Sequence, residues 1–267
     1  MELAGKVTIV TGGGSGIGEA LCRAFAAEGA RAVVVADIAG DEAERVAAEL
    51  ADSGTESLGL RVDAGDGAEV RQLVATTEER FGPVDLFCAN AGIIVVGGVE
   101  VPDEQWERIW NVNVQSHIHA ARAVLPGMLA RGEGYLLHTA SAAGLLTQLG
   151  SAPYSVTKHA VVGLAEWLSM THGDAGVRFS CLCPMGVRTN LLDAGQDRSA
   201  GAVVISQGVI EPEECADAVV AGLATEEFLI LPHPEVAEFF LRKATDHDRW
   251  LAGMRRLQAT IEGGLSS

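Results

Sequence analysis

The sequence predicts an α/β protein built on a doubly wound, parallel, seven-stranded sheet with helices on both faces. Short β-branched runs alternate along the chain with longer segments of helical period. The short runs are apolar at nearly every position, which is typical of strands buried on both faces. Each run is followed by a segment long enough for a crossover helix, and parallel neighbours require such a crossover.

The expected strands, in order along the chain, are residues 6–10, 32–36, 57–62, 84–89, 135–139, 177–183 and 228–231. The expected helices are residues 18–28, 41–51, 68–81, 103–131, 155–172 and 212–224. The glycine-rich residues 190–210 predict a substrate loop, because their periodicity is weak. The mixed-charge residues 234–261 predict a C-terminal helical extension that caps the sheet or joins subunits. Since the chain has no long linker and no internal repeat, residues 1–267 are expected to form one domain.

The composition excludes several classes of function. The 267 residues include 36 acidic and 19 basic side chains, and the formal charge of −17 disfavours nucleic acid as a partner. No apolar run reaches the roughly 18–20 residues of a membrane span, and the chain opens without a basic leader. A cytoplasmic protein without a membrane partner is therefore expected. The five cysteines form no C-x-x-C pair and are interpreted as reduced, packed thiols.

A glycine-rich turn follows the first strand and opens the first helix. Thr11, Gly12, Gly16 and Gly18 fit the spacing T-G-x-x-x-G-x-G, whereas the pattern G-x-G-x-x-G fails because Ile17 occupies its third glycine position. Glycines in this context let the backbone approach a pyrophosphate, whose charge meets the N–H groups of the helix N-terminus. The alternative is a merely flexible turn, for which the clustered glycines would be entropically wasteful.

An aspartate ends the second strand. Asp37 lies about 20 residues beyond the glycines, where a carboxylate can accept hydrogen bonds from the adenosine ribose and repel a 2′-phosphate. NAD is therefore expected as the cofactor in preference to NADP. The alternative for Asp37 is an acidic helix cap before Asp41. Asp63 closes the third strand and could meet the adenine, although alone it would be an ordinary turn residue.

A tyrosine and a lysine stand four residues apart on an expected helix. Tyr154 and Lys158 share one helical face, so the phenol and the ammonium can address one bound molecule. A nearby positive charge lowers the pKa of a phenol from about 10 towards the operating pH. Tyr154 is therefore a candidate general base or acid. The alternative is a pair of surface residues on the helix.

Further motifs stand in order along the chain, and together they carry a resemblance. They are residues 90–92 (Asn-Ala-Gly), Asn113, Ser141 and residues 184–189 (Pro-Met-Gly-Val-Arg-Thr). With the glycine turn and the tyrosine–lysine pair, they resemble the short-chain dehydrogenase/reductase superfamily, in its single-domain branch of about 250 residues. The resemblance runs from Lys6 to about Leu231. It implies a Rossmann fold and a domain that both binds a dinucleotide and catalyses oxidoreduction.

The resemblance also implies roles for individual residues. Ser141 would hydrogen-bond the substrate oxygen, and Tyr154 would exchange a proton with it. Lys158 would lower the pKa of the tyrosine and bind the nicotinamide ribose, while Asn113 would hold a water that links Lys158 to solvent. The implied cofactor site comprises Gly12, Ser15, Gly16, Ile17, Gly18, Asp37, Ile38, Asp63, Ala64, Asn90, Ala91, Gly92, Tyr154, Lys158, Pro184, Gly186, Val187 and Thr189.

Two positions depart from the family pattern. Met185 stands where the family commonly has a glycine, directly before Gly186, and is expected to reshape the nicotinamide end of the pocket. Ala89 replaces the first asparagine of the usual Asn-Asn-Ala-Gly run, where it mainly supports strand packing. Neither departure removes a proton-transfer group.

The expected substrate pocket is largely apolar. Its candidate walls are Ile93, Ile94, Val95, Leu145, Leu146, Gln148, Met185, Leu191 and Leu192, several of which could instead pack the core. Such a lining favours a hydrophobic secondary alcohol or its ketone. No metal is expected, because the seven histidines form no ligand set: His117 and His119 diverge on a helix and the others are scattered.

Several readings of the function remain open. The leading hypothesis is an NAD-dependent alcohol dehydrogenase or ketone reductase acting on a small molecule. The alternatives are an oxoacyl-thioester reductase, which usually takes NADPH, and a non-catalytic dinucleotide-binding relative. Family members usually form dimers or tetramers through two long helices, so a homodimer or homotetramer is expected. Leu164, Trp167 and Leu168 would supply its apolar face, although core packing explains them equally well.

Overall fold

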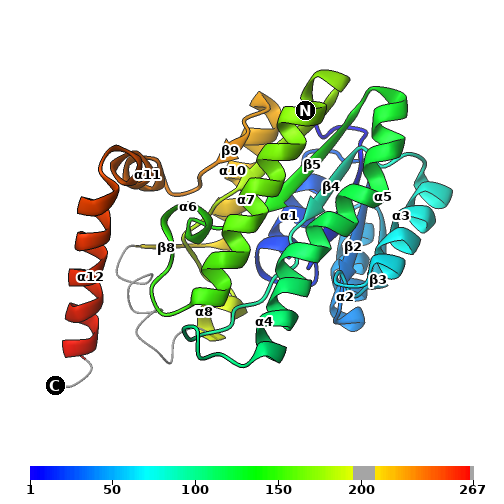
Figure 1. The fold of residues 1–267 in the computed structure, drawn as a ribbon. Helices are drawn as coiled ribbons and strands as arrows, with labels where there is room; N and C mark the ends of the chain where they lie inside the picture. Colours follow the sequence, from blue (N-terminus) through cyan, green and yellow to red (C-terminus); the bar gives the residue numbers. More distant parts are fainter. Residues whose placement is uncertain (195–207, 265–267) are drawn as a thin grey trace.

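The computed structural model describes residues 1–194 and 208–264, and a parallel sheet of seven strands runs through its centre (Figure 1). The strands are β1 (Val7–Thr11), β2 (Ala32–Asp37), β3 (Glu56–Arg61), β4 (Leu86–Ala89), β5 (Gly134–Thr139), β6 (Val177–Leu182) and β9 (Leu229–Ile230). Their order is β3-β2-β1-β4-β5-β6-β9, which confirms the predicted seven-stranded parallel sheet. The order reverses between β1 and β4, and open parallel sheets bind ligands beyond the carboxyl ends of the strands at such a point.

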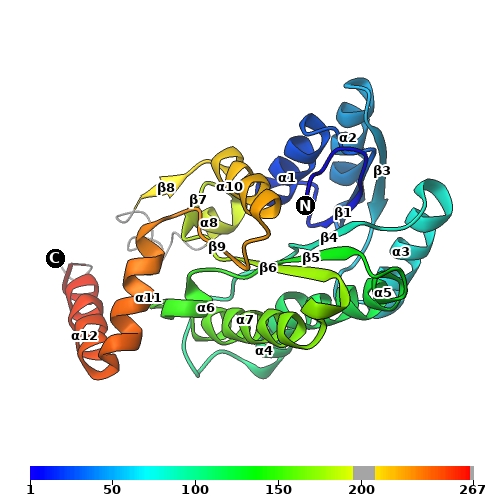
Figure 2. The same ribbon diagram turned by 90° about the horizontal axis from the view of Figure 1, so that it is seen from above.

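Helices cover both faces of the sheet (Figure 2). One core contains side chains of α1 (Gly16–Ala27), α2 (Gly40–Asp52) and α10 (Pro212–Thr225). The opposite core contains side chains of α3 (Gly67–Phe81), α5 (Ser116–Arg131) and α7 (Ala152–His172). Alternate residues of β1, β2, β4 and β5 therefore enter opposite cores, and this is why these strands are mostly apolar, whereas the edge strand β3 packs only Leu58 and Leu60 against one core. The doubly wound prediction is confirmed. A 3-10 turn, Gly173–Ala175, joins α7 to β6.

The helix expected at residues 103–131 is interrupted, so this prediction was wrong in detail. It consists of α4 (Asp103–Trp110), a π-helical turn (Asn111–Gln115) and α5. The wider turn accommodates one extra residue, and such turns are frequent at functional sites. It leaves the side chain of Asn113 fully buried.

Short elements beyond the sheet were not predicted. They are α6 (Ala143–Leu146), α8 (Asn190–Ala194) and the two-stranded parallel pair of β7 (Gly186–Val187) with β8 (Val209–Ile210). Each is too short to give a periodic signal. The expected substrate loop, residues 190–210, thus begins as α8 and ends in β8, while residues 195–207 lie outside the described part of the chain.

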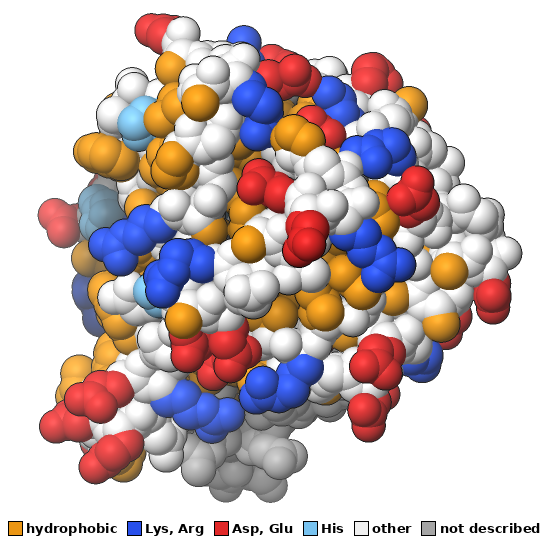
Figure 3. Space-filling model, turned by 90° about the vertical axis from the view of Figure 1, so that its right-hand side faces the viewer, with side chains coloured by type: hydrophobic (Ala, Val, Ile, Leu, Met, Phe, Trp, Pro, Cys, Tyr) orange, Lys and Arg blue, Asp and Glu red, His pale blue; other side chains and the backbone are white. Residues whose placement is uncertain are grey.

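The C-terminal extension consists of α11 (Glu235–Thr245) and α12 (His247–Gly264), which stand beyond α6 at one end of the molecule (Figures 1 and 2). Lys243 on α11 donates a hydrogen bond to the carbonyl of Leu145 on α6, so the extension is attached to the body of the domain. Among the described helices, none combines the length and the apolar character that crossing a bilayer requires. Figure 3 shows acidic and basic side chains interspersed over one face, as on an ordinary solvated surface.

Candidate active site

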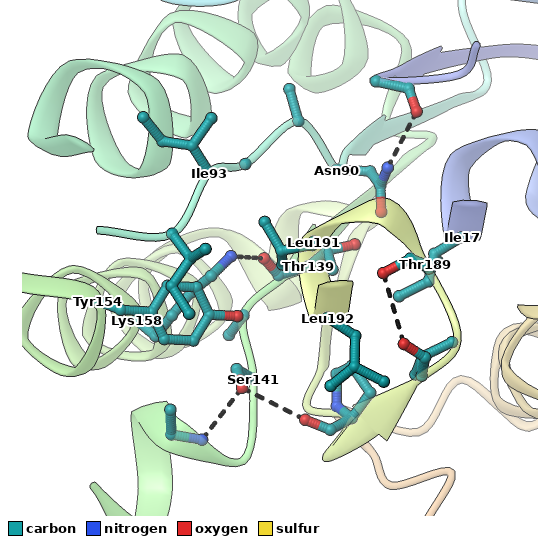
Figure 4. Close-up of a pocket in the computed structure, with 18 of the residues that line it drawn as sticks. Ile17, Asn90, Ile93, Thr139, Ser141, Tyr154, Lys158, Thr189, Leu191 and Leu192 are labelled. Atoms are coloured by element: carbon teal, nitrogen blue, oxygen red, sulfur yellow. Dashed lines mark hydrogen bonds between the residues drawn. The ribbon is translucent and has the colours of Figure 1, made fainter. Parts of the chain in front are cut away.

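A cleft of about 950 Å³ opens at the carboxyl ends of the strands, and it contains most of the predicted site. From the predicted cofactor set it is lined by Gly12, Ser15, Gly16, Ile17, Gly18, Asp37, Ile38, Asp63, Ala64, Asn90, Ala91, Gly92, Tyr154, Lys158, Pro184, Val187 and Thr189. From the predicted substrate walls it is lined by Ile93, Ile94, Leu146, Gln148, Met185, Leu191 and Leu192, whereas Val95 and Leu145 are buried in apolar clusters and do not line it. The catalytic candidates Ser141, Tyr154 and Lys158 meet on one of its walls (Figure 4).

The glycine turn between β1 and α1 has no room for side chains. Gly12 and Gly16 have positive φ angles of 65° and 53°, which favour glycine. A Cβ on Gly18 would lie 1.9 Å from the carbonyl oxygen of Gly12, so the helix begins directly against the turn. The backbone is thus exposed to the cleft at the N-terminus of α1, the arrangement that accepts a pyrophosphate. This cradle fits the dinucleotide that the sequence predicts.

Asn90 fastens the end of β4 to the end of β1. Its backbone N–H donates to the Thr11 hydroxyl at 3.0 Å, and its side-chain amide donates to the Thr11 carbonyl at 3.1 Å (Figure 4). These two strands lie on either side of the point where the strand order reverses. Asn90 therefore fixes the floor of the cleft where a dinucleotide would cross the sheet.

The carboxylate of Asp37 is held at the end of β2 by two backbone N–H groups. Gly14 donates to one of its oxygens and Ala39 to the other, each at 3.0 Å. The carboxylate keeps lone pairs for hydroxyl donors, because each oxygen accepts only one of these bonds. Asp63, two residues after the end of β3, similarly accepts from the N–H of Gly65 at 2.8 Å and also lines the cleft.

Helix α7 carries both the tyrosine and the lysine, and it begins at Ala152, three residues before the expected start. The reason is the cap: the hydroxyl of Ser151 accepts the N–H of Tyr154. The ammonium nitrogen of Lys158 lies 5.6 Å from the centre of the Tyr154 ring. It donates to the carbonyl of Thr139 at 2.9 Å (Figure 4). The two side chains therefore converge on the cleft, as their spacing predicts.

Ser141 completes the group at the end of β5. Its hydroxyl donates to the carbonyl of Pro184 at 3.3 Å and accepts the N–H of Ala143 at 3.1 Å. Burial raises the pKa of Tyr154 to about 12, and a hydrogen bond with Ser141 opposes that rise. Burial lowers the pKa of Lys158 to about 8. Desolvation thus disfavours the charged form of both groups.

Asn113 does not line the cleft, and its side chain is already engaged. Its oxygen accepts the N–H of Ile93 at 2.8 Å, and its nitrogen donates to the carbonyl of Ile93 and to the Thr157 hydroxyl. A Cβ on Gly92 would lie 3.5 Å from both the Asn113 oxygen and the Lys158 nitrogen, so Asn113 lies close beside Lys158. The expected water would have to use the second lone pair of its oxygen.

Gly186 also differs from expectation, since it is absent from the lining of the cleft. Its backbone pairs with Val209 in the short β7–β8 ladder, and its carbonyl contacts the ring of His233. The preceding Met185 does line the cleft, and it packs against the apolar cluster below. The family's usual glycine position is therefore occupied by a side chain at the cleft surface.

Residues of the C-terminal extension that were not predicted as site residues line the substrate end of the cleft. Phe239 and Arg242 on α11, with Trp250 and Met254 on α12, line the cleft beyond Met185. Aromatic residues within a mixed-charge tail were the available signal, but nothing in the sequence placed them near the cleft. Arg242 is paired with Glu238. This end of the cleft is therefore largely apolar.

A buried histidine pair was also missed. His117 on α5 and His138 on β5 are fully buried, and their Nδ1 atoms lie 3.0 Å apart. Burial lowers both pKa values, that of His138 to about 4, so both rings are neutral near pH 7. Within residues 1–194 and 208–264, no cluster of three or more His, Cys, Asp or Glu side chains could hold a metal ion.

The comparisons with known proteins agree with this geometry. Residues 6–199 match the family described as short chain dehydrogenase. The chain is 34% identical over 232 residues to meso-2,3-butanediol dehydrogenase of Serratia marcescens, covering 85% of this chain and 90% of that protein. It is 35% identical over 261 residues to 1-deoxy-11-beta-hydroxypentalenate dehydrogenase of Streptomyces exfoliatus, covering 94% of this chain and 90% of that protein.

Among solved structures, a short chain dehydrogenase/reductase from Burkholderia phymatum in complex with NAD is similar over 93% of this chain and 96% of that chain. The TM-score is 0.85, and the sequences are 32% identical. The family match covers the glycine turn, the end of β5 and helix α7. The chain therefore belongs to the short chain dehydrogenase family.

Proposed function

We propose that this protein is an NAD-dependent oxidoreductase that transfers a hydride between nicotinamide and the carbinol carbon of an apolar secondary alcohol. The observation that carries the proposal is the convergence of Ser141, Tyr154 and Lys158 in the cleft that begins at the glycine turn. Relatives named as dehydrogenases of hydroxylated compounds, and a similar structure that contains NAD, support it.

The chain's own residues supply the proton chemistry. When bound, NAD accepts or returns the hydride. The Ser141 hydroxyl donates a hydrogen bond to the substrate oxygen and orients the carbinol carbon. In alcohol oxidation the Tyr154 oxygen accepts the hydroxyl proton, and in ketone reduction it returns one. The Lys158 ammonium stabilises the phenolate, and Asn113 holds the adjoining 92–93 segment beside that lysine.

The cofactor preference follows from Asp37. Its carboxylate stands where the adenosine ribose would lie, and it can accept hydrogen bonds from both ribose hydroxyls. A 2′-phosphate at the same place would meet a like charge. NAD is therefore the preferred cofactor, and this separates the proposal from an oxoacyl-thioester reductase that uses NADPH.

The substrate end of the cleft favours a mainly apolar alcohol or ketone. Ile94, Leu146, Met185 and Leu191 line it, and the α11–α12 aromatic residues add to the apolar surface. Burying these side chains against the hydrocarbon part of a substrate favours binding by roughly 25 cal/mol per Å² of apolar area removed from water. A charged substrate would lose its hydration there without a free partner among these side chains.

A screen of apolar secondary alcohols, followed by the appearance of NADH, tests the proposal. With an alcohol that the protein oxidises, Tyr154→Phe should lower kcat at least about 1,000-fold, because the substitution removes the proposed proton acceptor, which acts together with Ser141 and Lys158. NADH binding, measured by fluorescence, stays within about threefold, since the pyrophosphate cradle is untouched. Tyr135→Phe is the matched control, because Tyr135 is the other tyrosine and bonds Ser180 inside the sheet. Substantial turnover by Tyr154→Phe would refute the assigned role.

We further propose a cytoplasmic homodimer or homotetramer. All five cysteines are free and buried, which fits a reducing compartment. On α7, Trp167 is 55% exposed and Met170 is 79% exposed, whereas Leu168 packs in the core. Two exposed apolar side chains on one long helix suit a self-complementary contact. Light scattering at assay concentration measures the oligomeric state.

A further inference from the structure

His233 makes two hydrogen bonds to a turn that lies 48 residues earlier in the chain. Its Nδ1 accepts the N–H of Met185 at 3.2 Å, and its Nε2 contacts the carbonyl oxygen of Gly186 at 3.1 Å. The side chain is buried at 3% exposure. Because an N–H can only donate and a carbonyl can only accept, these partners require the neutral ring with its proton on Nε2.

The backbone at this position is restrained on both sides. Pro232 and Pro234 flank His233, and each fixes its own φ angle and lacks an N–H. A residue that precedes proline is also kept out of the helical region. The carbonyl of His233 accepts the N–H of Val236 in the first turn of α11. The imidazole is therefore presented from a rigid support at the base of the C-terminal helices.

The turn that His233 holds also contacts the proposed catalytic serine. Pro184 precedes Met185, and its carbonyl accepts the hydroxyl of Ser141 at 3.3 Å and the N–H of Ala142 at 2.8 Å. Pro184 and Met185 line the cleft. A shift of this turn would move the partner of Ser141 and one wall of the cleft together.

His233 lies between the 184–186 turn and the helices α11 and α12, which line the substrate end of the cleft. Phe239 and Trp250, which line that end, belong to the two helices that follow His233. Below them Val236 is fully buried in one cluster with Cys183, while Met185 packs against its edge. His233 thus makes a polar contact between the base of α11 and the 184–186 turn, in addition to the hydrogen bond from Lys243 to Leu145 farther along the helix.

We propose that His233 is a positioning residue, which ties the base of α11 to the 184–186 turn and thereby sets the substrate end of the cleft opposite Ser141. The inference rests on the proposed function for its kinetic consequence only. The double hydrogen bond explains why a buried polar ring stands between two prolines, since an apolar side chain would leave the Met185 N–H and the Gly186 carbonyl without this partner.

Three substitutions separate the two hydrogen bonds. His233→Phe keeps the ring but removes both bonds. His233→Asn keeps an acceptor near the Nδ1 position, and His233→Gln keeps a donor near the Nε2 position, so each retains one bond. His247→Phe is the matched control, because His247 is an exposed histidine of the same extension. Circular dichroism establishes that each variant is folded.

The kinetic arm compares alcohol oxidation with NADH binding. We expect His233→Phe to lower kcat/KM for the alcohol roughly 10- to 100-fold, the effect of a small displacement of reacting groups. The Asn and Gln variants should show smaller losses and the control none. NADH affinity should fall less than kcat/KM, because the glycine turn that receives the pyrophosphate is untouched and only the contacts of the 184–187 segment would shift. A kcat/KM of His233→Phe close to that of the unaltered protein would overturn the proposal.

The structural arm needs no activity. Long-range nitrogen NMR spectra of histidine-labelled protein should show the proton of His233 on Nε2, and a proton on Nδ1 would overturn the proposal. Trypsin should cut at Arg242 and Lys243 at least about tenfold faster in His233→Phe than in the control, since α11 would be released locally. An unchanged rate of tryptic cleavage would contradict the proposed link between α11 and the 184–186 turn. Inactivity of the unaltered protein with every alcohol would count against the proposed function, while these two measurements would still decide the role of His233.

Discussion

Replacing Lys158 by methionine tests the electrostatic basis of the proposed proton transfer. The ammonium lies 5.6 Å from the centre of the Tyr154 ring, inside the protein. At an effective dielectric constant of about 20, one charge at this distance stabilises a phenolate by about 3 kcal/mol. Since one pKa unit corresponds to about 1.36 kcal/mol, the substitution should raise the pKa of the tyrosine by about 2 units.

The measurement is the pH profile of kcat for alcohol oxidation at saturating NAD. The apparent pKa on the acid side of this profile should rise by about 2 units in Lys158→Met, and at pH values below that pKa kcat should be about 100-fold lower than in the unaltered protein. Saturation matters because Lys158 is also expected to bind the nicotinamide ribose, which would raise the KM for NAD. Lys6→Met is the control, because Lys6 pairs with Glu133 on the surface. An acid limb within about half a unit of the unaltered protein's would refute the reasoning.

Three further predictions concern the cofactor cradle, the cofactor preference and the buried histidines. Gly18→Ala should abolish NADH binding in a fluorescence titration, because its Cβ would lie 1.9 Å from the Gly12 carbonyl; Gly163→Ala, with nothing within 4 Å, should bind normally. Asp37→Ser should shift the ratio of kcat/KM for NADPH over NADH upward roughly 100-fold, because a like charge is removed. For His138, burial lowers the pKa from 6.5 to about 4, so protonation favours the unfolded chain. The stability that the neutral, buried ring contributes is complete above about pH 6.5, and the free energy of unfolding falls by about 3 kcal/mol as the pH falls towards 4. In urea unfolding, His138→Asn should therefore lose correspondingly less stability than the unaltered protein between about pH 7 and pH 4.

The parts of the site that could be predicted from the sequence depend on local spacing. Tyr154 and Lys158 share a face because they lie one turn apart, whatever the exact start of the helix. Asp37 could be placed because it ends an apolar strand, and parallel strands bring their carboxyl ends to one edge. The same periodicity predicted the seven-stranded sheet, although β4 and β9 are shorter than expected.

The parts that could not be predicted depend on contacts between distant segments. The π-helical turn inserts a single residue into a long helix, and this leaves the apolar period almost unchanged. Asn113 faces inward because it bonds the backbone of Ile93, a contact that no local pattern encodes. His117 and His138 are far apart in sequence, so single-residue reasoning could not pair them. Phe239 reaches the cleft only because α11 follows the last strand at that end.

The opposed pKa shifts of Tyr154 and Lys158 bear on how the direction of the proposed proton transfer would be set. Burial raises the pKa of Tyr154 to about 12 and lowers that of Lys158 to about 8, so the site by itself favours a neutral phenol. A phenolate becomes favourable only when positive charge gathers beside it. Oxidised nicotinamide carries such a charge and reduced nicotinamide does not. The tyrosine should therefore accept a proton when the cofactor can accept a hydride, and should hold one when the cofactor can donate a hydride. Under the proposed function, one buried phenol would in this way serve as base for oxidation and as acid for reduction.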